Sequence, residues 1–147
     1  MNIQVRIKKL NPNATVPTYG SLYSAGADLY ACEDFPVSIN PGETKLIHTG
    51  LSFEIPENFG GFIYARSSLG TKRGLAPANK VGVIDSDYRG EVMVALYNQS
   101  SSVQTVEPGE RVAQLVIAPF LKADFIESDE LSDTVRGAGG FGSTGSK

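Results

Sequence analysis

Hydrophobic and polar residues alternate in short runs along most of this 147-residue chain. The first run, "IQVRI" (3–7), places an aliphatic residue at every second position, and "LSFEI" (51–55) repeats the pattern. Because successive side chains of a strand point to opposite faces, this period of two indicates half-buried strands. The runs "EVMVALY" (91–97) and "ERVAQLVI" (110–117) are rich in β-branched residues and also favour strands.

Turn-forming residues separate these runs at short intervals. They include "NPN" (11–13), "NPGE" (40–43), "PENFGG" (56–61) and "EPGE" (107–110). The two Pro-Gly pairs favour type II turns, because proline fixes φ at one central position and glycine accepts a positive φ at the next. Many short strands with Gly/Pro-rich turns are typical of an antiparallel sandwich, barrel or jelly roll, so we predict an all-β fold.

Helical periodicity is nearly absent from the sequence. No stretch shows the apolar i, i+3, i+4, i+7 stripe of an amphipathic helix. At most, "SSLGTKRG" (67–74) forms a short helical turn, for which Ser67 or Ser68 is the expected N-cap. We therefore expect one short helical segment within an otherwise β-rich domain.

The composition changes near the C-terminus. A polar stretch, "IESDELSDTV", follows Phe125 and leads into a glycine-rich end. A chain of this length forms one domain by the usual prior. We therefore predict a β domain over residues 1–125 and a flexible C-terminal arm over 126–147, whose glycine-rich motif spans 136–145.

Composition and charge narrow the function classes. The net charge is −3 and the pI is near 5.1, whereas polynucleotide-binding domains are usually basic. Cys32 is the only cysteine and His48 the only histidine, which excludes an intramolecular disulfide and leaves His-based triads short of partners. No segment has the apolar length of a signal peptide or a membrane span. We expect a cytoplasmic protein that binds neither polynucleotides nor membranes, with small anions still open as ligands.

Two segments in the first half of the chain combine small, hydroxyl and charged residues. In "AGADLYA", Asp28 is either a turn aspartate bonded to its own backbone or part of a site. In "ARSSLG", Arg66 precedes Ser67 and Ser68. Free N–H groups and a guanidinium bind a phosphate well together, but the same residues also suit a solvated helix start. Both alternatives stay open for each segment.

The segment "NKVGVIDSDYRGEV", which begins at Asn79, is the most informative. An apolar run over 81–84 delivers Asp85 to the point where a strand meets a turn, and Tyr88 follows. A carboxylate held there can accept a proton from water, which makes Asp85 a candidate general base. The alternative is an Asp85 that pairs with an arginine to hold the turn. Gln114, within "ERVAQLV", is on local grounds an outward-facing residue of a half-exposed strand.

The final segment, "RGAGGFGSTGSK" (136–147), is not a Walker phosphate-binding loop. It does not fit G-x-x-x-x-G-K-[ST], because its lysine follows the hydroxyls and no room remains for a helix. It is either a plain Gly/Ser tail or a flexible grip for an anion. In the second case Arg136 supplies charge, Ser143 and Thr144 donate hydrogen bonds, and Phe141 offers a stacking face.

Taken in order, the five segments resemble the five motifs of the trimeric dUTP pyrophosphatase (dUTPase) family, and the match runs from Ala25 to Gly145. The resemblance implies a jelly-roll homotrimer that hydrolyses dUTP to dUMP and pyrophosphate with Mg²⁺. Such an enzyme keeps uracil out of DNA and supplies dUMP for thymidylate synthesis. Each active site would be built between subunits, with the arm of one subunit closing over a pocket formed by the other two.

The resemblance also assigns chemical roles. Asp28 would hold the metal through water, and Arg66 would lie close to Asp85, which orients the attacking water. The catalytic set implied in this way is Asp85, Arg66, Ser67 and Gln114. Family members usually carry proline where this chain has Ala65, and often glycine where it has Ser68. Whether the Ser68 hydroxyl takes part therefore stays open.

Substrate recognition is assigned on the same basis. Asn79 would read uracil together with backbone groups near Gly82 and Val83. Tyr88 would pack on the deoxyribose and leave no room for a 2′-hydroxyl. The remaining substrate contacts implied by the resemblance are Ser68, Arg136, Phe141, Gly142, Ser143 and Thr144.

Two other functions compete with this one. A dCTP deaminase shares the fold and a similar "RSS" motif, but its catalytic glutamate lies in the strand after Asp85, where this chain has Ala95 and where Glu91 comes too early. A jelly-roll binding protein without catalysis fits the strand pattern alone. It gives no reason, however, for a phenylalanine among the terminal glycines.

Overall fold

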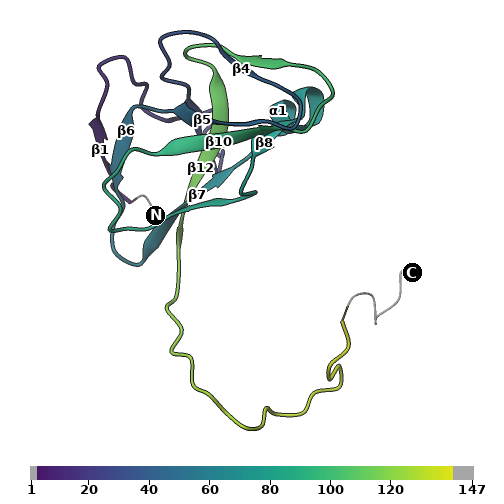
Figure 1. The fold of residues 1–147 in the computed structure, drawn as a ribbon. Helices are drawn as coiled ribbons and strands as arrows, with labels where there is room; N and C mark the ends of the chain where they lie inside the picture. The colour runs from purple at the N-terminus through teal and green to yellow at the C-terminus, as the bar shows by residue number, and fades with distance from the viewer. Residues whose placement is uncertain (1–2, 141–147) are drawn as a thin grey trace.

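The computed structural model describes residues 3–140, which form short β-strands and one short helix, as predicted (Figure 1). The helix, α1, spans Ser67–Arg73 and is far too short to cross a membrane. The strands are β1 (Arg6–Lys9), β2 (Thr18–Tyr19), β3 (Ala27–Tyr30), β4 (Val37–Ile39), β5 (Thr44–His48), β6 (Leu51–Glu54), β7 (Phe59–Tyr64), β8 (Leu75–Pro77), β9 (Gly82–Ile84), β10 (Met93–Asn98), β11 (Gln104–Val106) and β12 (Arg111–Pro119).

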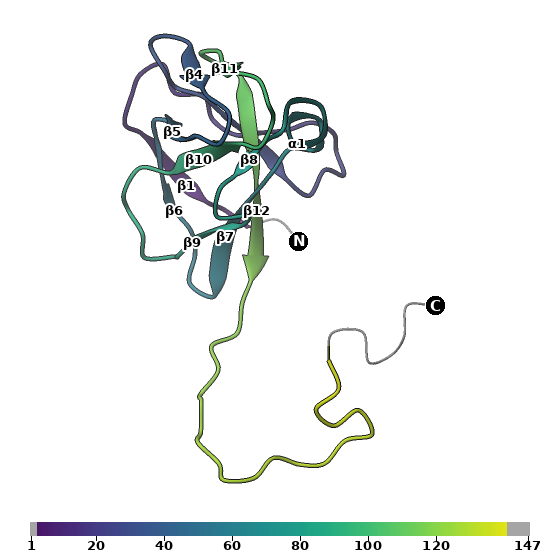
Figure 2. The same ribbon diagram turned by 45° about the vertical axis from the view of Figure 1, so that its right-hand side comes forward.

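The strands described here pair only in antiparallel fashion, which confirms the predicted fold class. The largest sheet has the order β2-β3-β12-β7-β9, and a second sheet has the order β5-β10-β8. Two-stranded pairs, β1-β6 and β11-β4, complete the body (Figures 1 and 2). In the largest sheet β12 lies between β3 and β7, so residues from three distant parts of the chain become neighbours on it.

The predicted alternation of side chains produces the core. On β10, Val94 and Leu96 are buried while Met93 is exposed, as a period of two requires. The N-terminal run forms a strand only from Arg6 onwards, because its partner strand β6 ends at Glu54. The most deeply buried apolar side chains are Leu29, Ile39, Ile47, Leu51, Leu75, Val94, Leu96, Val106 and Val112.

Both Pro-Gly turns form as the sequence predicts. The Glu43 N–H donates to the Asn40 carbonyl at 2.9 Å, and the glycine between them, Gly42, has φ +74°. The second turn, before β12, closes in the same way, with φ +77° at Gly109. These tight turns set the register of the strands that follow them.

The predicted helical turn is present, but its predicted N-cap is wrong. Arg66 occupies the N-cap position in an extended conformation, and no side chain caps the helix. Ser67 is already the first helical residue, because β7 delivers the chain in an extended form up to Arg66. The helix ends at Gly74, which has φ +66° and donates its N–H to the Leu69 carbonyl.

The chain leaves the body at the end of β12. The Phe120 N–H still donates to the Asn58 carbonyl at 3.0 Å, but residues 121–138 are all exposed. No strand or helix forms in the described residues after Pro119, and the segment runs well away from the body (Figures 1 and 2). The division between residues 125 and 126 stays a prediction.

Candidate active site

Two separate hollows contain most of the candidate residues, and they have no lining residue in common. The hairpin pocket has a volume of about 320 Å³ and is lined by Leu46, Ile63, Pro77, Asn79, Gly82, Val83, Ile84, Asp85, Tyr88, Glu91, Val92, Met93, Val94 and Ala95. The arginine pocket has a volume of about 280 Å³ and is lined by Gly20, Ser24, Ala25, Gly26, Asp28, Arg66, Ser67 and Gln114.

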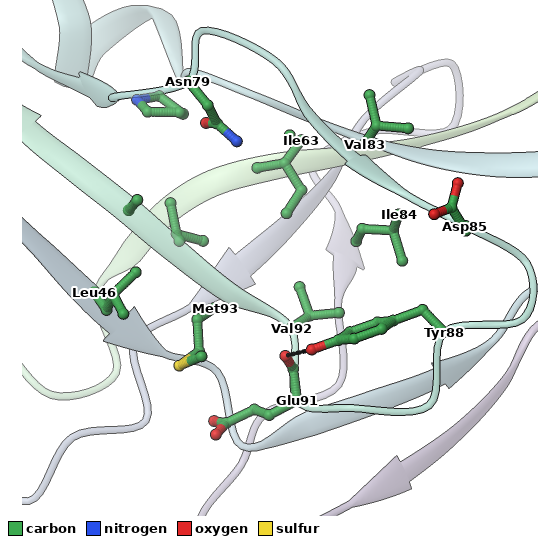
Figure 3. A pocket seen from close by; sticks show the side chains of 14 residues that line it. Leu46, Ile63, Asn79, Val83, Ile84, Asp85, Tyr88, Glu91, Val92 and Met93 are labelled. Carbon is green, nitrogen blue, oxygen red and sulfur yellow. Dashed lines mark hydrogen bonds between the residues drawn. The ribbon is translucent and has the colours of Figure 1, made fainter.

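One end of the hairpin pocket is formed by the turn between β8 and β9 (Figure 3). The Lys80 N–H donates to the Pro77 carbonyl at 3.0 Å, and Lys80 has φ +66°. This tight turn presents the exposed Asn79, whose side-chain amide has no hydrogen-bond partner within residues 3–140. A Cβ on Gly82 would lie 3.4 Å from the Asn79 Nδ2 and 3.3 Å from the Ile63 Cβ. Glycine therefore allows a flat group to approach the backbone beside a free amide.

Asp85 and Tyr88 lie across the pocket from Asn79 (Figure 3). β9 ends at Ile84, and the next residue, Asp85, is exposed. The Asp85 carboxylate makes no ion pair with any described residue, so the alternative in which an arginine holds it is not found within one chain. The nearest candidate, Arg89, instead donates to the carbonyls of Ser86 and Tyr88, at 2.6 and 3.0 Å.

The Tyr88 ring has a defined position although it is 44% exposed. Its hydroxyl donates to the Glu91 carbonyl at 2.9 Å. A Cβ on Gly90 would lie only 2.4 Å from the Tyr88 phenol oxygen, so the ring covers a place that only glycine leaves open. The result is an aromatic face at the mouth of an otherwise largely apolar pocket.

The arginine pocket is built around Asp28 on β3, which is only 8% exposed. Arg66 donates its Nε–H to Asp28 Oδ1 at 2.8 Å, and Arg111 Nη1 lies 3.3 Å from Asp28 Oδ2. Two guanidinium groups therefore share one nearly buried carboxylate. Arg66 follows the end of β7 and Arg111 begins β12, which pairs with β7 on one side and with β3 on the other.

Gln114 reaches this pocket through the strand register. It lies opposite Asp28 on one side of β12 and opposite Tyr64 on the other. Its amide donates to the Ala65 carbonyl at 2.8 Å, and a Cβ on Gly26 would lie 2.5 Å from its Oε1. On local grounds Gln114 was expected to be an outward-facing residue of a half-exposed strand. That interpretation is incomplete, because the Gln114 side chain also binds the backbone of the segment before α1.

The two serines at the start of α1 differ in position. Both serines are exposed, but Ser67 lines the arginine pocket next to Arg66, whereas Ser68 lines neither pocket. The Ser67 carbonyl accepts a hydrogen bond from the Thr71 hydroxyl at 2.8 Å within the helix. The structure thus joins Arg66 and Ser67, but not Ser68, in one polar hollow.

The dUTPase family model matches residues 12–145, and so spans all of these segments. The chain belongs to the dUTPase family. It is 52% identical to the deoxyuridine 5′-triphosphate nucleotidohydrolase of Nautilia profundicola, over 97% of this chain and 99% of that protein. It is 47% identical to the protein of the same name from Acinetobacter baylyi, over the whole of both chains.

A solved dUTPase structure agrees with this assignment. The fold is similar to that of the Staphylococcus bacteriophage 80alpha dUTPase with dUPNHPP, with a TM-score of 0.90 and 27% identity. The alignment covers 98% of this chain and 99% of that one, and so includes most of the C-terminal arm. The predicted family and β fold are therefore confirmed.

Hydrolases of the dUTPase family use a divalent metal. Within residues 3–140 no three acidic, His or Cys side chains converge on one point. Asp28 is the only carboxylate of the arginine pocket, and each of its oxygens already faces a guanidinium. This fits a hard ion that keeps several waters and takes its other ligands from phosphate, with Asp28 reached through water.

The arm carries the remaining candidates. Arg136 is exposed, and its Nε–H donates to the Gly139 carbonyl at 2.8 Å in a small loop in which Gly137 has φ +51°. Figure 1 shows the yellow end of the ribbon, which contains this loop, well away from the β-strands of its own body. The other predicted arm contacts lie outside the described residues: Phe141, Gly142, Ser143 and Thr144.

One expected contact of the dUTPase site is not found within a single chain. Arg66 pairs with Asp28 rather than with Asp85, and the two pockets that hold them share no residue. The reason is topological, since Arg66 follows β7 whereas Asp85 follows β9, and these two neighbouring strands run in opposite directions. Antiparallel neighbours end at opposite edges of a sheet.

Sequence reasoning missed three side chains near the pockets. Arg111 binds the second oxygen of Asp28. The signal that could have identified it is its position, three residues before the candidate Gln114 in the same predicted strand. Glu91 and His48 form a pair at 3.0 Å beside the hairpin pocket. The hydrogen bond to Glu91 raises the pKa of His48 above its ordinary value, and burial opposes this effect. No local pattern joins these two residues, because β5 and β10 bring them together.

Proposed function

We propose that this chain hydrolyses dUTP to dUMP and pyrophosphate at sites shared between the subunits of a homotrimer. The observation that carries the proposal is the division of the candidate residues between two pockets of different character. The hairpin pocket is mostly apolar, with a few polar groups that suit a nucleoside. The arginine pocket is polar and suits phosphates.

In the hairpin pocket, Asn79 and the backbone near Gly82 and Val83 read uracil. The free Asn79 amide and the close backbone approach at Gly82 support this role. A base with the wrong donors and acceptors leaves these polar groups unpaired, which costs more than a missing methylene does. Tyr88 packs on the deoxyribose, and its fixed ring leaves no room for a 2′-hydroxyl.

Asp85 acts as the base in the hydrolysis. It accepts a proton from the attacking water, whose oxygen forms a bond to the α-phosphorus while the bond from that phosphorus to the α,β-bridging oxygen breaks. Pyrophosphate leaves. The exposed, unpaired carboxylate at the end of β9 supports this role, because no described cation holds it in another contact.

Arg66, Ser67 and Gln114 bind and orient the phosphates from the arginine pocket. Ladder pairing fixes Gln114 in the middle of β12, and its hydrogen bond to the Ala65 carbonyl holds the segment that leads to Arg66 and Ser67. These groups are therefore preorganised before substrate arrives. Mg²⁺, when bound, neutralises phosphate charge, and Asp28 holds it through water. The exposed hydroxyl of Ser68 contacts phosphate from outside the arginine pocket.

The homotrimer joins the two pockets. One chain keeps Asp85 and Arg66 in different hollows, so a complete site requires the hairpin pocket of one subunit to face the arginine pocket of another. Exposed apolar side chains support an assembled state, because the body carries an apolar groove of about 640 Å³ and the segment after β12 carries large exposed residues. These residues are Leu121, Phe125 and Ile126.

The arm of a third subunit closes the site. In this proposal residues up to 125 belong to the assembled body, and residues 126–147 reach across to the nucleotide. Arg136, Gly142, Ser143 and Thr144 bind phosphate, and Phe141 stacks on uracil. The course of the arm away from its own body supports a contact with another subunit (Figure 2).

The cellular role follows from the reaction. Hydrolysis of dUTP keeps uracil out of DNA and supplies dUMP for thymidylate synthesis. We infer a cytoplasmic enzyme, and the lone Cys32 supports a reducing compartment. The net charge of −3 supports a small nucleotide rather than a polynucleotide as ligand.

The competing deaminase reaction is disfavoured by two side chains. Ala95 lines the hairpin pocket at the place where a deaminase carries its catalytic glutamate, and it has no proton to transfer. The carboxylate of Glu91 already binds His48 and the Gly50 N–H. A pyrophosphate-release assay with Mg²⁺ across the deoxynucleoside triphosphates and UTP, with ammonia followed in parallel, tests the proposal. We expect pyrophosphate from dUTP and no ammonia from dCTP, whereas no turnover of dUTP would reject it.

A further inference from the structure

The loop that carries Asp85 and Tyr88 is attached to the body through one short segment, which we call the 48–52 corner. It runs from the end of β5 to the start of β6. Each bond to the loop comes from a different residue of this corner. They are Ser52 Oγ to the Arg89 carbonyl at 2.7 Å, the Val92 N–H to the Leu51 carbonyl at 2.9 Å, the Thr49 hydroxyl to the Val92 carbonyl, and the Gly50 N–H to Glu91 Oε1 at 2.8 Å.

Glu91 is the junction of this attachment. Its Oε1 accepts the Gly50 N–H, its Oε2 lies 3.0 Å from His48 Nδ1, and its backbone carbonyl accepts the Tyr88 hydroxyl at 2.9 Å. Figure 3 shows Glu91 at the edge of the hairpin pocket with the Tyr88 ring above it. One residue thus connects the body of the protein to the ring that faces the pocket.

We propose that Glu91, clamped by His48 and Gly50, is a positioning residue that fixes the Tyr88 ring and so sets the affinity for dUTP and its preference over UTP. The inference rests on the proposed function of the same pocket. Glu91 touches no substrate atom in this account, and acts only through Tyr88.

We call the bonds from Glu91 to His48 and Gly50 the clamp. The clamp is rigid where it joins the body of the protein, at Gly50. Gly50 is buried and has φ +67°, and a Cβ there would lie 2.9 Å from the Ala14 Cβ and 3.0 Å from the Cys32 Sγ. The fixed backbone points the Gly50 N–H in one direction, and Glu91 Oε1 lies there to accept its hydrogen bond. Without that carboxylate, a buried donor loses its partner, which costs more than an exposed hydrogen bond does.

At Tyr88, the bond to the Glu91 carbonyl is the one hydrogen bond that the described residues give to the side chain. The ring lies over Gly90, which offers no side chain to pack against, and nearly half of Tyr88 is exposed. Its hydroxyl bond to the Glu91 carbonyl therefore decides where the ring lies. A shift of the Glu91 backbone moves the ring with it.

The charge of His48 tightens the clamp. Two carboxylates face His48: Glu91 binds its ring, and Glu33 accepts its backbone N–H at 2.7 Å. The charges of Glu91, Glu33, Asp34 and Lys9 also act on the neighbouring thiol of Cys32. The hydrogen bond to Glu91, with the charges of Glu91 and Glu33, raises the pKa of His48 against the opposing effect of burial, so the charged pair persists to higher pH than for a free histidine. Once the proton is lost, only a neutral hydrogen bond remains.

Kinetics with dUTP and UTP on the intact protein test the inference. In Glu91→Ala, we expect the KM for dUTP to rise roughly ten- to hundredfold and the dUTP-over-UTP preference to fall, because a buried donor loses its acceptor and the loop shifts. The Glu91→Gln variant keeps an acceptor for Gly50 and should retain a KM within about threefold of the original chain.

Glu43 offers a matched control. Its carboxylate also accepts a backbone N–H, from Asn40 at 2.9 Å, and also pairs with a cation, Lys45 at 2.8 Å, but Glu43 directly precedes β5, at the end opposite His48. Glu43→Ala should lower the melting temperature without changing KM or substrate preference. A Glu91→Ala protein that behaves like Glu43→Ala would overturn the inference.

The pH profile gives an independent readout that needs no destabilised variant. His48→Gln donates to Glu91 at every pH but never carries charge. Below about pH 6.5 we expect its KM to exceed that of the original chain by roughly two- to fivefold, and the two values should converge as pH rises through the raised pKa of His48. Identical KM profiles for the two proteins would reject the role of His48. If the original chain does not hydrolyse dUTP at all, that result rejects the proposed function, whereas the results above test the role of Glu91.

Discussion

The two pockets differ in how the chain builds them. In the hairpin pocket, Asn79, Asp85 and Tyr88 lie within one short segment, and turns within that segment place Asn79 and Asp85. In the arginine pocket, Asp28, Arg66 and Gln114 come from three strands, and only the register of β3, β12 and β7 brings them together. One pocket depends on local backbone geometry and the other on the integrity of a sheet.

This difference predicts different consequences of mutation. Changes at Asn79 or Asp85 in the hairpin pocket should alter nucleoside recognition or proton transfer while the fold stays intact, because both side chains are exposed. Changes in the arginine pocket should also lower stability, because its carboxylate is nearly buried between two cations.

The largest effect is expected from Asp85→Asn. Loss of a positioned general base lowers kcat by roughly 10²- to 10⁴-fold, whereas the nearly isosteric side chain leaves the pocket in shape. We expect dUTP still to bind, with a melting temperature close to that of the original chain. Single-turnover kinetics and calorimetric binding measure the two parts, and an unchanged kcat would remove Asp85 as the base.

Arg66→Ala, in contrast to Asp85→Asn, should lower both stability and activity. It leaves Asp28 with Arg111 alone, at 3.3 Å, so the free energy of unfolding should fall by about 1–3 kcal/mol. Loss of a cation from the phosphate site should lower kcat/KM roughly 10²- to 10³-fold. Denaturant unfolding and steady-state kinetics measure both. The control is Arg6→Ala, which breaks an exposed pair with Glu54 and should change neither.

Two glycine substitutions compare the pockets directly. Gly90→Ala places a Cβ 2.4 Å from the Tyr88 phenol oxygen, and Gly26→Ala places one 2.5 Å from Gln114 Oε1. The first should raise KM and reduce the dUTP-over-UTP preference, and the second should lower kcat, each by roughly ten- to hundredfold. Gly70→Ala meets no atom closer than 3.9 Å and should leave the kinetics unchanged. If both variants changed the same kinetic parameter, the division between the pockets would be contradicted.

The smallest expected effect concerns stability and pH. The pKa of His48 is raised in the folded protein by its bond to Glu91, so the protonated form favours folding. This contribution is full below about pH 6.5, the pKa of a free histidine, and is lost as pH rises through the higher folded pKa. Because the side chain is 51% exposed, the melting temperature should differ from that of His48→Gln by only about 1–2 °C at low pH. The difference should vanish at high pH in a thermal melt.

Much of the fold follows from local sequence patterns. The period of two predicted the strands, and Gly42 and Gly109 predicted the turns, because these features depend on neighbouring residues only. The predicted N-cap failed because the long extended strand β7 leads directly into α1, so Arg66 rather than a serine takes the boundary position. Helix boundaries depend on the direction in which the preceding strand delivers the chain.

The site divides in the same way. The hairpin pocket residues could be chosen from one segment, since turn chemistry places Asn79 and Asp85 locally. Arg111 and Glu91 could not, because their contacts with Asp28 and His48 join residues far apart in the sequence. Such contacts depend on strand register, which no short motif contains.

A mixed-subunit assay tests most directly whether the site is shared. Asp85→Asn subunits and subunits that lack residues 136–147 are each expected to be nearly inactive alone. After confirmed subunit exchange, the account predicts that dUTP hydrolysis returns, because some sites then combine an intact Asp85 with an intact arm from a different chain. Mixed trimers as inactive as their parents would contradict a site built from several subunits.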